Sequence, residues 1–238
     1  MFLVDIFRII ELCTVENMCL AELQEDALFE KIPAGEVGDY VDSIISIAAG
    51  KADDIKLKFK QKKKLKSESP GAKISLIDIC RSKGVSVNLT DGSRAQAGGR
   101  FRAEIYYDEK IINIMKYSID QMYDALKNFL VYFGENKNFI SVDNIKDMHI
   151  AHELYHLIEF TDGEYTPDLL PPVTSLNIFG FERRSGFSKA SEAAAHIFCM
   201  RLLELPFHPK MLDYLCLLSA GEVTREKLIE FLEDLKIR

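Results

Sequence analysis

The chain has 238 residues, of which 47% are hydrophobic and 28% charged, a composition that is ordinary for a folded globular protein and excludes a disordered or fibrous one. Thirty basic residues against 37 acidic ones give a net charge of -7, so general polyanion binding is not predicted. The apolar runs fall short of the roughly 20 residues that a membrane-spanning helix needs, so no membrane partner is expected.

The first third of the chain is predicted to be helical. Apolar residues recur at helical spacing over residues 2–13 and again from Val37 to Gly50, where the second helix is expected to end. Residues 56–66 hold seven lysines and are interpreted as a solvated helix face or linker, with a patch for nucleic acid or an acidic partner as the alternative. The SESPGA segment, residues 67–72, then marks a boundary after an N-terminal helical region, residues 1–66.

A short helix is expected to follow that boundary. Ser69 can cap it and Pro70 can occupy its first position. Ile74, Ile77 and Cys80 would form its inner face.

Strands and helices then alternate. Residues 84–89 and 101–107 are rich in β-branched and aromatic residues and predict two strands, with residues 110–115 continuing or pairing with the second. Helical spacing returns over residues 116–133, and Asp143 is expected to cap the next helix.

The last third contains a long loop and more helix. Residues 161–187, with a proline-rich stretch at 166–172, are predicted to be a loop that gates access to a site. Residues 188–204 predict a helix, and two short helices are expected around 209–217 and 225–236.

The HELYH segment, residues 152–156, is the sharpest chemical signal. His152 and His156 are four apart on a helix, so their imidazoles project from one face and can both reach one Zn²⁺ ion at roughly 2.0–2.1 Å. Glu153, beside the first histidine, can hold and deprotonate the attacking water.

A catalytic zinc site normally has three protein ligands, and Glu192 is the candidate for the third. The alanines that follow it at 193–195 would let its helix approach a neighbour closely. Asp162 is the alternative, although the glycine of the HExxHxxGxxH pattern is replaced by Glu159. Glu159 shares a helical face with His156 and is expected either to support that ligand or to face solvent.

Two further histidines could assist catalysis or orient a metal ligand. His196, one turn after Glu192, is the predicted catalytic partner of Glu153, as a donor to an oxyanion or as a group that orients a ligand. His149, one turn before His152, could do the same but is interpreted as a partly exposed surface residue.

These segments together resemble the ImmA/IrrE family of metallopeptidases, a gluzincin-like group. The resemblance spans roughly residues 70–207 and includes the helix–Gly–strand segment 79–89 and the strand at 101–109. Its residues are His152, Glu153, His156, Glu192, Ala193, Phe198, Leu202, Leu203 and Pro206. The chain departs from the family pattern at Tyr155, where glycine is usual, and in the later position of Phe198.

The resemblance implies an α+β fold with a mainly helical, zincin-like catalytic domain (67–207), a small twisted sheet beside the HExxH helix, and C-terminal helices (208–238) packed on it. The implied function is that of a Zn²⁺-dependent endopeptidase that cleaves one specific protein, often a transcriptional repressor. The alternatives are a metal-binding sensor or interaction module that does not cleave, or a DNA-associated regulator, although nucleic acid is not the expected partner.

A cytoplasmic location is expected. The N-terminus is apolar but interrupted by Asp5, Arg8 and Glu11, and it has no basic leader, so no signal peptide is predicted. The five cysteines are odd in number and scattered, which favours reduced thiols.

Overall fold

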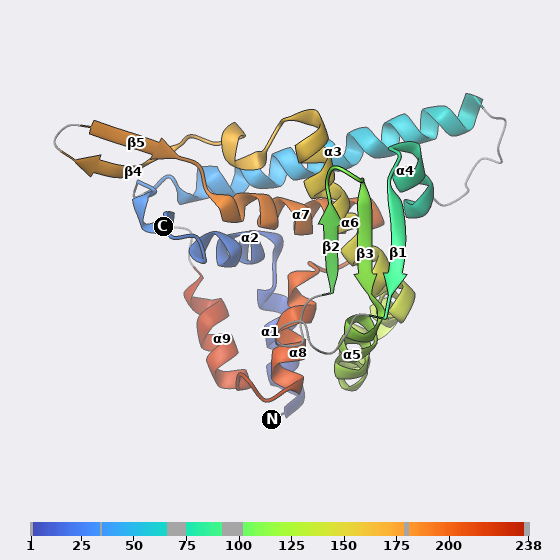
Figure 1. The fold of residues 1–238 in the computed structure, drawn as a ribbon. Helices are drawn as coiled ribbons and strands as arrows, with labels where there is room; N and C mark the ends of the chain where they lie inside the picture. The colour runs from blue at the N-terminus through green and yellow to red at the C-terminus, as the bar shows by residue number, and fades with distance from the viewer. Residues whose placement is uncertain (1, 34, 66–74, 92–101, 179–180, 236–238) are drawn as a thin grey trace.

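The computed structural model describes residues 2–33, 35–65, 75–91, 102–178 and 181–235. They form a mainly helical molecule with two small sheets, which confirms the α+β class in general terms (Figure 1). SESPGA, with the predicted capping residues Ser69 and Pro70, lies outside the described residues, as does Ile74.

The α-helices are α1 (Phe2–Leu12), α2 (Val15–Gln24), α3 (Val37–Leu65), α4 (Leu76–Ser82), α5 (Lys116–Leu126), α6 (Val142–Asp162), α7 (Ser188–Leu203), α8 (Lys210–Ser219) and α9 (Arg225–Asp234). The 3₁₀ segments are η1 (Phe29–Lys31), η2 (Lys127–Phe139) and η3 (Thr166–Leu169). The strands are β1 (Ser86–Thr90), β2 (Ala103–Tyr106), β3 (Ile111–Met115), β4 (Val173–Ile178) and β5 (Phe181–Ser185).

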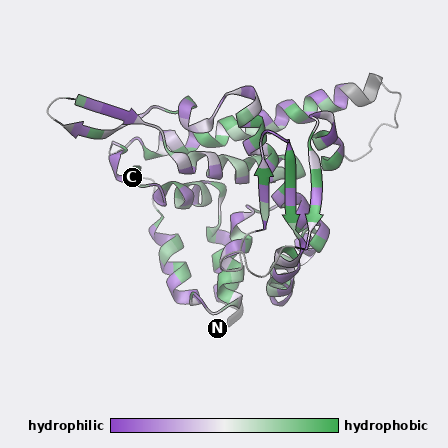
Figure 2. Ribbon diagram, viewed as in Figure 1, coloured by the Kyte–Doolittle hydropathy of each residue, from purple (hydrophilic) through white to green (hydrophobic). Residues whose placement is uncertain are grey.

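The three-stranded sheet has the order β1-β3-β2, with β3 parallel to β1 and antiparallel to β2. The central strand β3 buries Ile112 and Ile114 completely, and Figure 2 shows it as the most continuously hydrophobic strand of this sheet. Residues 110–115 therefore pair with the 101–107 strand, one of the two predicted outcomes. Both β2 and β3 contact α6, so the sheet lies beside the helix that carries HELYH.

Helix α7 is packed on several sides, by α2, α3 and α6. Its alanines at 190 and 193–195 are fully buried, and so are Ala48 and Ala52 of α3. Small side chains in both helices permit close approach of their backbones. The N-terminal helices α2 and α3 thus pack directly on the helix that carries Glu192, and α1 packs against α9.

Helix α3 does not end at Gly50, contrary to the sequence prediction, but continues to Leu65. A glycine inside a helix costs about 1 kcal/mol relative to alanine. The buried stripe of Ile44, Ala48, Ala52 and Ile55 continues across the glycine and offsets that cost. The first lysines of the 56–66 run are therefore helical, and Lys58 and Lys60 are exposed to solvent.

Other predictions of helix boundaries and faces were also wrong in detail. Ser141, and not Asp143, caps α6, since its side chain accepts a hydrogen bond from the backbone N–H of Asn144. In α4 the buried residues are Leu76, Ile79 and Cys80, whereas Ile77 is 39% exposed. The helix predicted over residues 116–133 is α-helical only to Leu126 and continues as η2.

The segment 161–187 is not a continuous loop, since it contains η3 and the antiparallel hairpin of β4 and β5. The hairpin projects from the body of the molecule in Figure 1. It returns to the core at Gly186, where a Cβ atom would lie 2.5 Å from the carbonyl oxygen of Pro167. The next residue, Phe187, is fully buried and packs edge-on against Tyr40.

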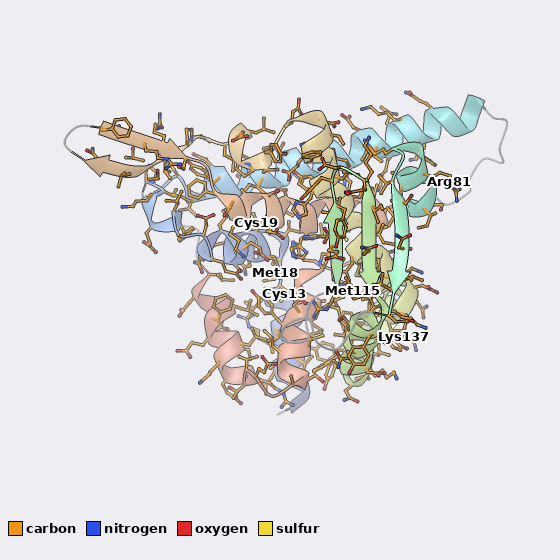
Figure 3. The ribbon with its side chains drawn as sticks, viewed as in Figure 1. Cys13, Met18, Cys19, Arg81, Met115 and Lys137 are labelled. Carbon is orange, nitrogen blue, oxygen red and sulfur yellow. The ribbon has the colours of Figure 1, made fainter. Side chains whose placement is uncertain are left out.

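All five cysteines are free, and four of them are buried. In Figure 3 Cys13, Met18 and Cys19 lie within the molecule, whereas Arg81 and Lys137 lie at its rim. None of the helices in the described ranges combines the length and the apolarity that crossing a lipid bilayer requires.

Candidate metal centre

His152, His156 and Glu192 converge between α6 and α7. The Nε2 atoms of the two histidines are 3.2 Å apart, and a Glu192 carboxylate oxygen lies 3.2 Å from His152 Nε2 and another 3.6 Å from His156 Nε2. Two ligands of a tetrahedral zinc ion at 2.0–2.1 Å would be roughly 3.3 Å apart. Among the described residues these three form the one His/Cys/Asp/Glu group whose ligand atoms are close enough to hold a metal ion.

The three donors therefore fit zinc in type, number and spacing. Two imidazoles and a carboxylate are a donor set found in catalytic zinc sites, which leave a further position for water. Asp162, the alternative third ligand, is exposed at the end of α6 and is not in the group.

Electrostatics within the cluster favour a charged Glu192. Hydrogen bonding to His152 and then to His156 holds the pKa of the Glu192 carboxyl far below its usual range. Burial alone would lower the pKa of His156, but Glu159 and Glu192 outweigh it and raise this pKa to about 10. The cluster is thus arranged to carry both negative and positive charge in one small space.

His156 is held from behind by a buried carboxylate. Glu159 is only 1% exposed, and one of its oxygens lies 3.5 Å from His156 Nδ1. The same oxygen accepts a short hydrogen bond from Ser191 Oγ, and the other accepts from Thr166 N at 2.8 Å and Thr166 Oγ1 at 2.6 Å. Glu159 therefore supports the ligand and does not face solvent.

Tyr155 is a bulky residue at the position where the resembled family has glycine, and the interior of the molecule accommodates it. Its side chain is fully buried, packs against Phe198 and shares a hydrogen bond of 2.5 Å with Thr166 Oγ1. Since Thr166 also holds Glu159, the tyrosine belongs to the network behind His156. Sequence reasoning missed Thr166 and Ser191, because neither has a local pattern that points to His156.

Glu153 lies on α6 beside the candidate metal ligands His152 and His156. Burial, the largest influence, raises the pKa of its carboxyl, and Glu192 and Glu104 of β2 act in the same direction against the histidines. A carboxylate with a raised pKa is a better proton acceptor than an ordinary one.

His196 lies on the other side of His152. The centroids of the His152 and His196 rings are 4.7 Å apart and their planes are tilted by 59°, and His196 Nε2 lies 3.7 Å from a carboxylate oxygen of Glu22. His196 Nδ1 is buried and has no hydrogen-bond partner among the residues that the structure describes, and the same is true of His208 Nε2 on the neighbouring ring. The structure thus brings His196 against His152, a candidate metal ligand, and the role of His196 as a catalytic donor stays a prediction.

His149 is partly buried and, with His152 and His196, lines a pocket between α5, α6, α7 and α8. The sequence interpretation of a surface histidine missed this pocket, because Met122 and Leu212, which help to form it, are far away in the chain.

Comparisons with family models, with curated proteins and with solved structures give no match to this chain.

Proposed function

We propose that this protein is a zinc-dependent endopeptidase that cleaves a specific protein substrate. The observation that carries the proposal is the convergence of His152, His156 and Glu192, at spacings of 3.2 to 3.6 Å, with Glu153 beside them. A purely structural metal site has no chemical need for a general base next to its ligands. The HExxH spacing supplies that base.

Zinc, when bound by these three residues, would supply a Lewis acid that polarises the scissile carbonyl and lowers the pKa of water. Glu153 accepts a proton from the water whose oxygen attacks the carbonyl carbon. As the carbon–nitrogen bond breaks, Glu153 passes that proton to the leaving amine.

The position of β2 supports a peptide as substrate. Among the described strands, β2 pairs only with β3 and is thus an edge strand, and it contacts α6. An extended peptide can add to such an edge through backbone hydrogen bonds. Recognition by strand addition and by pockets suits a regulatory protease with one protein substrate, such as a repressor, in the cytoplasm.

The decisive experiment compares zinc content and peptide cleavage in two variants. Glu153→Gln is expected to retain one zinc per chain and to lose cleavage, because its amide cannot accept the proton. Glu192→Ala is expected to weaken zinc binding by more than about 100-fold, since loss of a ligand costs more than loss of an outer partner.

Asp162→Ala is the matched control for Glu192→Ala and should keep its zinc. Elemental analysis and a chelator-controlled peptidase assay give the two readouts. Full cleavage by Glu153→Gln would disprove the mechanism, and zinc binding without cleavage in the wild type would favour a sensor or interaction module.

A further inference from the structure

The C-terminal half of α6 is open to solvent along one narrow stripe. From His149 to Phe160 the residues that are not buried are His149, His152, Glu153, His156 and Phe160, and the others are buried. These positions recur at helical spacing and therefore share one face of the helix. The two candidate metal-ligand histidines and Glu153 are thus presented on the same face as Phe160, which is 42% exposed.

Strand β2 lies beside α6, and Tyr107 follows the last residue of that strand. Just before the strand, Arg102 Nη1 pairs with a carboxylate oxygen of Asp213 in α8 at 2.7 Å. Just after it, the ring of Tyr107 packs on that of Phe160, with centroids 4.9 Å apart. Since Phe160 is one helical turn after His156, Tyr107 lies at the end of the face that presents the candidate metal ligands.

The hydroxyl of Tyr107 is open to a ligand. In the parts of the chain that the structure describes, the hydroxyl of Tyr155 is bonded to Thr166 and that of Tyr106 donates to Glu104, whereas no hydrogen bond involves the Tyr107 hydroxyl. The Tyr107 side chain is also 37% exposed, so a bound peptide can reach it.

Electrostatics keep this hydroxyl protonated. Burial raises the pKa of Tyr107, and the next largest influence is the negative charge of Glu153, followed by smaller effects that include Glu159 and Glu192. The hydroxyl is therefore neutral near pH 7 and lies within electrostatic range of the carboxylates of the candidate metal centre. A neutral phenol can donate one hydrogen bond.

His196, the donor that the sequence predicts, faces the interior instead. Its Nε2 atom lies 3.7 Å from a carboxylate oxygen of Glu22. Its Nδ1 atom is buried without a hydrogen-bond partner among the described residues. Neither nitrogen is directed to solvent, so Tyr107 is the better candidate to contact a substrate.

We propose that Tyr107 is a catalytic residue whose hydroxyl donates a hydrogen bond to the oxygen of the scissile carbonyl. The inference rests on the proposed function, since it assumes a peptide bound at the metal centre. When the water oxygen adds to the carbonyl carbon, the π electron pair moves to the carbonyl oxygen, and the proton of the water goes to Glu153. Tyr107 keeps its own proton, and its hydrogen bond strengthens as negative charge grows on the carbonyl oxygen.

The test measures binding, and so does not depend on turnover. A phosphinic peptide of alanine residues carries a charged oxygen on a tetrahedral phosphorus where the scissile carbonyl would lie. A mercaptoacetyl dipeptide of alanine binds zinc through sulfur and has no such oxygen. Both are titrated calorimetrically into the zinc-loaded protein. Tyr107→Phe, which keeps the ring on Phe160, should weaken the phosphinic peptide about 10- to 100-fold, the effect of losing a hydrogen bond to a charged group.

The thiol peptide should bind Tyr107→Phe as it binds the wild type, which shows that the variant is folded and loaded. Tyr106→Phe is the matched control, because it removes the neighbouring hydroxyl, which donates to Glu104, and it should bind both compounds as the wild type does. In the peptidase assay, Tyr107→Phe should lower kcat by about 100-fold or more with its zinc content unchanged.

Equal binding of the phosphinic peptide by the wild type and Tyr107→Phe, or an equal loss for both compounds, would overturn the assignment of Tyr107. This failure is distinguishable from failure of the proposed function. If the wild type cleaves peptides and Tyr107→Phe cleaves them equally well, only the role of Tyr107 fails. If no peptide is cleaved while the selective loss of the phosphinic peptide persists, the peptidase proposal fails and Tyr107 remains a donor at the metal centre.

Discussion

Glu159 shows at the scale of a single residue how this site is held in place. The Glu159 carboxylate accepts hydrogen bonds from the backbone N–H and the hydroxyl of Thr166 and from the hydroxyl of Ser191. These three bonds fix the carboxylate behind His156 Nδ1. Burial alone would raise the pKa of Glu159, but its bonds to His156, Ser191 and Thr166 lower it, so the group is charged. A charged carboxylate on one ring nitrogen fixes the orientation of the other nitrogen toward a metal ion.

Glu159→Gln should therefore weaken zinc binding by about 10- to 100-fold, because the neutral amide orients His156 less firmly. Competition with a chromophoric chelator measures the change. Glu164→Gln, an exposed position just beyond α6, is the matched control and should bind zinc as the wild type does. Unchanged affinity in Glu159→Gln would mean that packing alone orients His156.

At the scale of elements, α7 begins without a cap from its own neighbours. Phe187 stands at the N-cap position and makes no side-chain capping bond. Asp26, which follows α2, supplies it instead, since one of its oxygens accepts from Ser188 Oγ and Lys189 N, both at 3.0 Å. Its other oxygen accepts from Leu28 N at 2.9 Å. A carboxylate from the N-terminal region thus caps the helix that carries Glu192.

Asp26→Ala should destabilise the protein by about 1–2 kcal/mol, because the first turn of α7 loses its cap and its favourable charge. Denaturant unfolding gives the free energy of unfolding. Asp54→Ala, an exposed position in α3, serves as the control. Equal stability of the two variants would contradict the capping role.

The Asp26 carboxylate also makes the free energy of unfolding depend on pH. Burial alone would raise the pKa of Asp26, but the bonds from Lys189, Leu28 and Ser188 hold it below its ordinary value. Because the pKa of Asp26 is lower in the folded state than in the unfolded state, its carboxylate stabilises the fold fully above the unfolded-state pKa of about 4. This stabilisation is lost as the pH falls through the folded-state pKa. The difference in unfolding free energy between wild type and Asp26→Asn should therefore shrink between about pH 5 and pH 2. A difference that grows on acidification would contradict this sign.

At the scale of the whole molecule, the candidate metal ligands His152, His156 and Glu192 come from two helices in different parts of the chain. The three side chains lie between α6 and α7, and α7 is packed in turn by α2 and α3. A ligand that binds only the folded state stabilises it by about 2.7 kcal/mol at a free concentration 100 times its Kd.

Added zinc should therefore raise the thermal unfolding midpoint, and a chelator should lower it. Scanning calorimetry of the metal-free and zinc-loaded protein checks this. Glu192→Ala should show little of the shift, whereas Asp162→Ala should show all of it. A shift of equal size in Glu192→Ala would place the stabilising metal elsewhere.

Local patterns in the sequence were sufficient to predict most helices, the strands of the larger sheet and the shared helical face of His152 and His156. Each of these depends on residues within a few positions of one another, as His152 and His156 do on one helical face. The helical interpretation failed at Gly50, because the packing that continues α3 comes from α7. It also omitted α2, whose apolar residues are less regularly spaced.

The tertiary structure decided which distant groups meet. Glu192 was a candidate from its surroundings, but only the packing of α7 on α6 brings its carboxylate to the two imidazoles. Asp26, Thr166 and Ser191 support the site from three separate segments, and the pocket at His149 is lined by residues of four helices, α5, α6, α7 and α8. These relations depend on contacts between residues far apart in the chain, which no local pattern contains.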